Sequence, residues 1–271
     1  MYKLNFILAA LAGALVWLAN RSAFFPMRYP AGEWTRQTEA GAQDAWFTTS
    51  DHVRIHAWWK PLPGARAVTL FLHGNAGNVT HRAAAMREIA AAGNAVLIPD
   101  YRGYGRSNGR PTEQGLYRDA DAAYEWLIAQ GWPPRRIILH GESLGTSIAT
   151  DLAARRACAG LILEAPFPSA RAVAARVLPL IGPLLVWGFD TRAKIAHVHA
   201  PLLVIHGTAD EVIDYTLGQE LFAAASEPKT LWAIPGAHHN DIAATAGPAY
   251  REHLRSFMMN ACNVAASSPS P

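Results

Sequence analysis

The stretch IILHGESLGTSIATDLAARR, residues 137–156, decides the fold. It begins with a short run typical of a buried strand and ends with a helical pattern, and between them stands Gly-x-Ser-x-Gly, from Gly141 to Gly145. A serine between a strand and a helix lies in a strained turn, so the residues two positions away must be very small, and glycine meets that need. The serine also lies at a helix N-terminus, where backbone N–H groups stabilise negative charge. The stretch therefore predicts that Ser143 is a nucleophile.

Strands and helices alternate along the rest of the chain. The apolar runs predict a leading hairpin and six further strands, at residues 46–49 with 53–59, then 67–72, 95–98, 137–140, 160–163, 202–206 and 230–234. Helical patterns lie between or after them, at residues 82–92, 115–129, 144–156, 216–225 and 248–259. This alternation predicts an α/β protein with a mostly parallel sheet and helices on both faces. In the 271 residues no repeat or long linker appears, so we expect one domain over 40–260 and a disordered tail over 261–271.

A nucleophilic serine needs a base beside it, and the base needs an orienting acid. Asp210 follows the apolar run at 202–206, and a pair of histidines, His238 and His239, follows the run at 230–234. Parallel strands present their C-terminal ends at one edge, so these loops should converge on Ser143. We expect Asp210 to be the acid and His239 the base, with His238 as the open alternative. Weaker candidates for the acid are Glu164, which ends a strand, and Asp190, whose position is typical of a helix N-cap. Asp214 is expected to cap the helix at 216–225.

A tetrahedral intermediate also needs two N–H donors for its oxyanion. The residue after the nucleophile, Leu144, supplies one of them. The second is expected from the loop His-Gly-Asn-Ala-Gly-Asn at 73–78, where glycines permit close approach of the backbone and Asn75 stands at the right place. An ordinary glycine turn is the alternative interpretation of this loop.

Residues 4–20 carry no charge and are flanked by Lys3 and Arg21. As a helix they would span roughly 26 Å, which is short but sufficient for a membrane anchor. We therefore interpret residues 1–30 as a membrane anchor, with a cleaved signal peptide or a surface helix as alternatives. The flanking charges barely distinguish the two orientations, and we favour the extracytoplasmic side.

Charge and cysteine usage argue against other classes of function. The net charge is +3 and the basic residues are scattered, so we expect no nucleic-acid partner. The two cysteines, Cys158 and Cys262, form no Cys-x-x-Cys motif, and adjacent histidines seldom bind one ion together. We expect neither a metal nor a cofactor.

Five strings taken together resemble the α/β-hydrolase superfamily. They are HGNAGN (73–78), DYRGYGRS (100–107), GESLG (141–145), HGTAD (206–210) and HND (239–241). The resemblance is narrower with the membrane-anchored branch of acyl-protein depalmitoylating enzymes and their bacterial relatives. It implies Ser143, Asp210 and His239 as nucleophile, acid and base, and Asn75 and Leu144 as oxyanion donors. Asp214 departs from this pattern, since relatives more often carry proline there. The resemblance further implies that residues 100–107 form a structural loop beside the site.

The insert at 166–200 lies where such folds carry a helical lid, and its centre, 177–187, is almost wholly apolar. Asp190 is its single acid, although an aminopeptidase needs carboxylates to hold the substrate ammonium. We therefore expect a serine hydrolase that cleaves ester or thioester bonds of acylated or lipid-like substrates. The alternative functions are a peptidase of the aminopeptidase type, another enzyme class on the same scaffold, and a non-catalytic binding protein. The alternative interpretation of the apolar insert is that it packs on the core and indicates nothing about the substrate. The natural substrate and the oligomeric state do not follow from the sequence.

Overall fold

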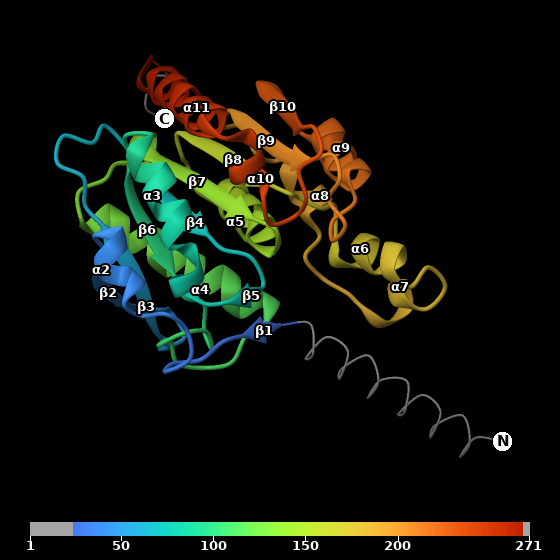
Figure 1. Cartoon of the computed structure of the whole chain (residues 1–271), viewed down its shortest axis with the longest axis horizontal. Coiled ribbons are helices and arrows are strands. Elements are labelled where there is room, and N and C mark those ends of the chain that lie inside the picture. The colour runs from blue at the N-terminus through green and yellow to red at the C-terminus, as the bar shows by residue number, and fades with distance from the viewer. Residues whose placement is uncertain (1–23, 268–271) are drawn as a thin grey trace.

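The computed structural model describes residues 24–267. Within them, eight strands form one sheet in the order β10-β9-β8-β7-β4-β6-β3-β2 (Figure 1). The strands are β2 (Gln43–Thr48), β3 (Arg54–Lys60), β4 (Val68–Leu72), β6 (Ala95–Pro99), β7 (Ile137–Glu142), β8 (Gly160–Glu164), β9 (Leu202–Gly207) and β10 (Lys229–Ile234). The six strands from β10 to β6 run parallel, and the hairpin of β2 and β3 joins them antiparallel through β6. This is the α/β-hydrolase fold, as predicted.

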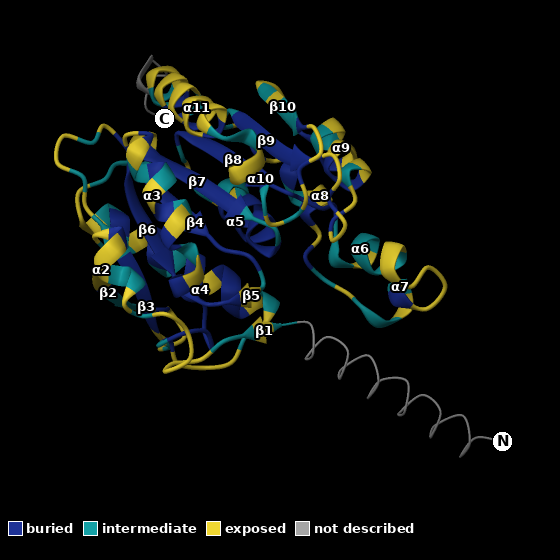
Figure 2. Ribbon diagram, in the orientation of Figure 1, coloured by how far each residue is buried: buried dark blue, intermediate teal, exposed yellow. Residues whose placement is uncertain are grey.

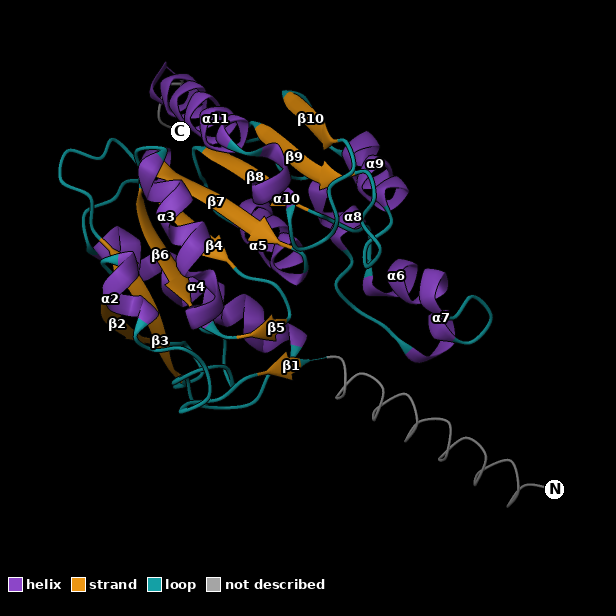
Figure 3. Cartoon of the chain, viewed as in Figure 1, coloured by secondary structure: helices purple, strands orange, loops and turns teal. Residues whose placement is uncertain are grey.

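Helices cover both faces of the sheet (Figure 3). One face carries α4 (Glu113–Ala129), α5 (Leu144–Arg155), α8 (Thr191–Ile195) and α9 (Tyr215–Ala224). The other face carries α2 (Arg36–Ala40), α3 (Ala83–Ala91), α10 (Ile242–Ala246) and α11 (Pro248–Ser267), with the short 3₁₀ turn Val79–Arg82 ahead of α3. The insert begins with α6 (Ala170–Val177) and α7 (Gly182–Leu185), which project beyond the sheet (Figure 1).

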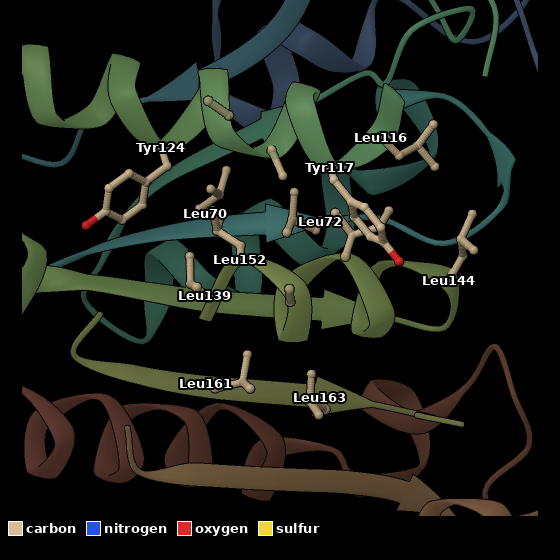
Figure 4. Close-up of a cluster of buried hydrophobic side chains, with 14 of the residues drawn as sticks. Leu70, Leu72, Leu116, Tyr117, Tyr124, Leu139, Leu144, Leu152, Leu161 and Leu163 are labelled. Atoms are coloured by element: carbon tan, nitrogen blue, oxygen red, sulfur yellow. The ribbon is translucent and has the colours of Figure 1, made fainter. Parts of the chain in front are cut away.

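Side chains alternate between two apolar layers because successive residues of a strand point to opposite faces. In β4, Leu70 and Leu72 pack with α4 and α5, whereas Phe71 packs with the layer that contains α3 and α11. Figure 4 shows the first layer, in which Leu161 and Leu163 of β8 lie beside the same cluster. The central strands are buried on both faces (Figure 2), so the ends of the strands are the accessible part of the sheet.

Both ends of the predicted domain need correction. Helix α11 continues to Ser267, so the expectation of a disordered tail from residue 261 is wrong for residues 261–267, and Ala261 is buried. Residues 24–30 belong to the folded domain instead of the N-terminal segment. Strand β1 (Phe25–Pro26) pairs in parallel with β5 (Ala76–Gly77), and the backbone of Arg28 forms a single β-bridge with that of Gly105. The predicted apolar helix at 4–20 lies outside the described residues. Within residues 24–267, none of the helices combines the length and the hydropathy needed to cross a membrane.

Candidate active site

Ser143 occupies the sharp turn between β7 and α5. Its backbone has φ 52° and ψ −115°, which places a residue with a side chain in the left-handed region. The two flanking glycines make this turn possible. A Cβ on Gly145 would lie 1.8 Å from the carbonyl oxygen of Leu72, and a Cβ on Gly141 would lie 2.4 Å from that of Gly145. Helix α5 therefore packs directly against β4 and holds the serine at the end of the strand.

Ser143, His239 and Asp210 form a hydrogen-bonded chain. The Nε2 atom of His239 lies 3.1 Å from the Oγ atom of Ser143, and its Nδ1 atom lies 2.8 Å from Oδ2 of Asp210. These distances fit an imidazole that donates from Nδ1 to the carboxylate and accepts the serine proton at Nε2. The three residues come from the ends of β7, β9 and β10, which the parallel sheet brings to one edge, as the sequence predicts.

The carboxylate of Asp210 is held ionised by its surroundings. Its Oδ1 atom accepts hydrogen bonds from the backbone N–H groups of Val212 at 2.9 Å and Ile213 at 2.7 Å. His206 Nε2 lies 3.3 Å from Oδ2. Burial alone would raise the pKa of Asp210, but the hydrogen bonds from His206, His239 and Ile213 outweigh burial, so the pKa lies well below its usual range. The site thus presents a fixed negative charge to the imidazole.

The neighbouring histidines have different partners. His238 points away from Ser143, and its Nδ1 atom lies 3.0 Å from Oε2 of Glu211. Its side chain is 58% exposed, whereas that of His239 is 10% exposed. The structure therefore joins His239, and not His238, to the serine.

The weaker candidates for the acid have other partners. Glu164 lies 2.6 Å from Nε2 of the buried His140 and accepts a hydrogen bond from the hydroxyl group of Tyr250. Asp190 caps α8 by accepting from the backbone N–H of Ala193 at 3.1 Å, and Asp214 caps α9 through that of Thr216 at 2.9 Å. Neither the buried Glu164 nor these two caps contacts the histidine of the site.

The glycine-containing loop at 73–78 lies beside the nucleophile. A Cβ on Gly74 would come within 3.5 Å of the Cβ of Ser143. The hydroxyl group of Tyr101 donates to the carbonyl of His73 at 2.9 Å, and that of Tyr104 donates to the carbonyl of Asn75 at 2.9 Å. The side-chain oxygen of Asn75 also accepts from Tyr104, at 3.0 Å. Two buried tyrosines thus fix the loop that holds Asn75, while Leu144 follows Ser143 as the first residue of α5.

His73 is neutral at physiological pH. Burial lowers its pKa to about 3, and the positive charge of Arg82 acts in the same direction. Its Nδ1 atom lies 2.7 Å from the carbonyl oxygen of Gly74. A neutral ring with its proton on Nδ1 can donate this hydrogen bond. His73 is therefore a rigid part of the loop, with no positive charge of its own.

An ion pair beside the nucleophile could not be foreseen from the sequence. The Nε atom of Arg82 lies 3.2 Å from Oε2 of Glu142, the residue before Ser143, and Nη2 of Arg82 donates to the carbonyl of Ala76 at 3.2 Å. The pair connects the nucleophile turn with the loop at 73–78. Arg82 precedes α3, an amphipathic helix that buries Met86 and Ile89, and its local sequence does not mark it as a partner of the nucleophile turn.

The loop at 100–107 is structural, as the resemblance implies. Arg102 forms ion pairs with Asp51 at 2.7 Å and with the buried Asp119 at 2.8 Å. Asp100 accepts from the backbone N–H of Val79 at 2.7 Å and so supports the start of α3. Residues 24–267 contain no group of three or more His, Cys, Asp or Glu side chains placed to hold a metal ion.

Comparisons with known proteins agree with this fold. The family model described as serine aminopeptidase, S33, matches residues 63–193. An uncharacterized protein of Mycobacterium tuberculosis is 39% identical over 249 residues, which are 90% of this chain and 88% of that protein. Alpha/beta hydrolase domain-containing protein 17C of Mus musculus is 40% identical over 202 residues, 72% of this chain and 61% of the relative. A Pyrococcus furiosus esterase shares the fold, with a TM-score of 0.73 at 20% identity over 88% of this chain and 98% of its own. The chain belongs to the α/β-hydrolase superfamily.

Proposed function

We propose that the protein is a serine hydrolase that cleaves carboxylic ester or thioester bonds through an acyl-enzyme. The observation that carries the proposal is the chain of contacts from Ser143 through His239 to Asp210, at 3.1 Å and 2.8 Å. Such an arrangement activates a hydroxyl group that is otherwise a weak nucleophile.

Each residue then has a defined task. Ser143 attacks the substrate carbonyl while His239 takes its proton, and Asp210 stabilises the imidazolium that forms. The backbone N–H groups of Asn75 and Leu144 receive the oxyanion. His239 next gives its proton to the leaving alcohol or thiol, and then activates a water molecule that releases the acid. The chemistry requires neither a metal nor a cofactor.

The apolar insert supports an acyl substrate. From residue 172 to residue 187 the single charged side chain is Arg176. The alternative activity, removal of N-terminal amino acids from peptides, is the one named in the description of the matching family model. It needs carboxylates to hold an ammonium group, but the acids Glu142, Glu164 and Glu211 beside the site are paired with Arg82, His140 and His238. Charge at the site therefore favours the ester or thioester.

We also propose that residues 4–20 anchor the protein in a membrane, which fits the membrane-anchored branch of the superfamily, and that the domain lies on the extracytoplasmic side. The uncharged stretch supports the anchor, whereas the flanking Lys3 and Arg21 barely distinguish the two orientations.

A fluorophosphonate probe tests the proposed nucleophile. We expect covalent labelling of the folded protein and none of the Ser143→Ala variant. Absence of labelling in folded protein would show a non-catalytic binding protein and overturn the proposal. Rates on p-nitrophenyl esters of rising chain length, compared with rates on alanine p-nitroanilide, then distinguish an acyl esterase from an aminopeptidase.

A further inference from the structure

The segment from the end of α6 to Trp187, with the loop before α7, carries more exposed large hydrophobic side chains than the rest of the described chain. Eleven large hydrophobic side chains of residues 24–267 are exposed, and six of them lie between residues 177 and 187. These six define the insert face, and they are Val177, Leu178, Leu180, Ile181, Leu184 and Trp187. Leu180 is the most exposed of the six, at 88%. An apolar patch of this kind on a folded domain marks a surface that meets another apolar phase.

Before Asp190, the charged residues of the insert are Arg171 and Arg176, and both are basic. Two acids from other elements lie against the insert: Glu113 accepts from the backbone N–H of Phe189 at 2.7 Å, and Asp214 lies close to Arg176. No acidic residue occurs between Glu164 and Asp190. The guanidinium of Arg171 lies 5.5 Å from the ring centre of Trp187, and Arg176 reaches to the hydroxyl group of Thr216 at 3.0 Å. Leucines with a tryptophan and bordering arginines are the composition of segments that lie in the headgroup region of an anionic bilayer.

The base of the insert is fixed next to the beginning of the described chain. The ring of Phe24 packs edge-on against that of Phe189, with centroids 6.1 Å apart. Phe24 follows the uncharged stretch 4–20 by four residues, which reach about 14 Å at most. Any bilayer that holds residues 4–20 is therefore close to the insert. Figure 1 shows α6 and α7 projecting from the domain, and β1 lying beside β5 at its margin.

The insert is also directly connected to the site. It begins after β8, and the carbonyl of Glu164 at the end of that strand accepts the backbone N–H of Ser143 at 2.9 Å. A lipid-facing insert would thus lie between the bilayer and the nucleophile.

We propose that the insert face is a membrane-binding surface that enters the interfacial region of a bilayer containing anionic phospholipid. The proposal rests on the proposed anchor at residues 4–20, and it adds a second contact that sets the orientation of the domain. Two contacts with the bilayer then restrict the orientation of the domain. The edge of the sheet that carries Ser143 faces the lipid, because the insert and Phe24 lie at that edge.

Site-specific fluorescence tests the proposal on the full chain. Leu180→Cys is labelled with an environment-sensitive nitrobenzoxadiazole probe in a Cys158→Ser, Cys262→Ser background, and the protein is reconstituted into vesicles of phosphatidylcholine and phosphatidylglycerol. The matched control is Val264→Cys, an exposed apolar position on α11. We expect blue-shifted emission and quenching by brominated lipids at position 180, and neither at position 264. Fluorophosphonate labelling of both proteins verifies that they are folded.

The outcomes separate the two proposals. If the protein binds vesicles but the probe at 180 behaves as the one at 264, the insert proposal is overturned and the anchor stands. If the protein binds no vesicles, the anchor and the insert proposal both fail. A blue shift that grows with protein density in the bilayer, without quenching by brominated lipid, would assign the insert face to a second copy of the chain and overturn the proposal. The Ser143→Ala variant should give the same quenching, so the result does not depend on catalysis.

Discussion

At the scale of single residues, the separate partners of His238 and His239 allow a sharp comparison. His239→Ala removes the group that accepts the serine proton, and we expect kcat/KM to fall by about 10⁴-fold or more. His238→Ala removes an exposed pair with Glu211, 3.0 Å apart, that includes neither Ser143 nor Asp210, so the rate should change by less than about fivefold. Initial rates on a short p-nitrophenyl ester measure both. Equal losses in the two variants would contradict the assignment.

The buried His73 predicts a pH dependence of stability. Its pKa is about 3 in the folded protein and about 6.5 in the unfolded chain, because burial disfavours the charged ring. The unfolded state therefore takes up a proton below about pH 6.5, whereas the folded state does not until about pH 3. The contribution of the neutral ring is complete above pH 6.5 and is lost progressively as the pH falls.

His73→Asn keeps a donor for the carbonyl of Gly74 but does not titrate. We expect it to reduce the slope of the free energy of unfolding against pH by up to about 1.4 kcal/mol per pH unit between these two pKa values. Urea unfolding at a series of pH values measures the slope. An unchanged slope would show that the ring already carries its charge in the folded state.

The nucleophile, acid and base candidates were identifiable because each follows an apolar run directly, and topology alone then brings Ser143, Asp210 and His239 together. The ion pair of Arg82 with Glu142 was not identifiable from the sequence, because it depends on how the residues before α3 lie against the nucleophile turn. The same holds for the loop at 73–78, where the sequence predicts the glycine turn but not its two tyrosine hydroxyl contacts.

At the scale of elements, the packing of α5 on β4 depends on Gly145. A methyl group there would lie 1.8 Å from the carbonyl oxygen of Leu72, a contact that requires the helix to move. We expect Gly145→Ala to lower the free energy of unfolding by about 3 kcal/mol and to displace Ser143 from His239. Chemical denaturation measures the first effect and the rate of fluorophosphonate labelling the second. Gly236→Ala, at a turn glycine with no atom near its Cβ position but a φ of 74°, is the control for backbone strain alone. Wild-type stability and labelling in Gly145→Ala would contradict the close-packed turn.

The ends of elements were harder to predict than their existence, because long-range contacts determine them. Helix α11 extends beyond Met259 since Ala261 packs against Gly160 of β8, where a Cβ would lie 3.0 Å from that alanine. Strand β1 is two residues long and exists through its pairing with β5, some fifty residues later. Neither contact leaves a periodic pattern in the sequence.

At the scale of the whole molecule, the parallel sheet converts sequence order into a site. Six parallel strands present their C-terminal ends at one edge, so loops far apart in the chain meet there. The insert follows β8, at the same edge as Ser143. The fold thus attaches the segment with the most exposed apolar side chains of the described residues to the edge of the sheet that carries Ser143.

The proposed anchor predicts that attachment to the membrane depends on the uncharged residues 4–20. We expect the full chain to remain in the membrane fraction after a carbonate wash, and Leu11→Lys with Leu15→Lys to release it, because each lysine at the centre of a span costs about 3 kcal/mol. The matched control places lysine at Met259 and Val264, exposed apolar positions on α11, and should stay bound. Both proteins should retain fluorophosphonate labelling at Ser143, because the substitutions lie outside the sheet and its loops. Wild-type protein that is soluble and lacks its first residues by mass would instead show a cleaved signal peptide. Wild-type protein that is soluble but intact would show a surface helix. Both results would contradict the anchor, and with it the proposed contact of the insert face with a bilayer.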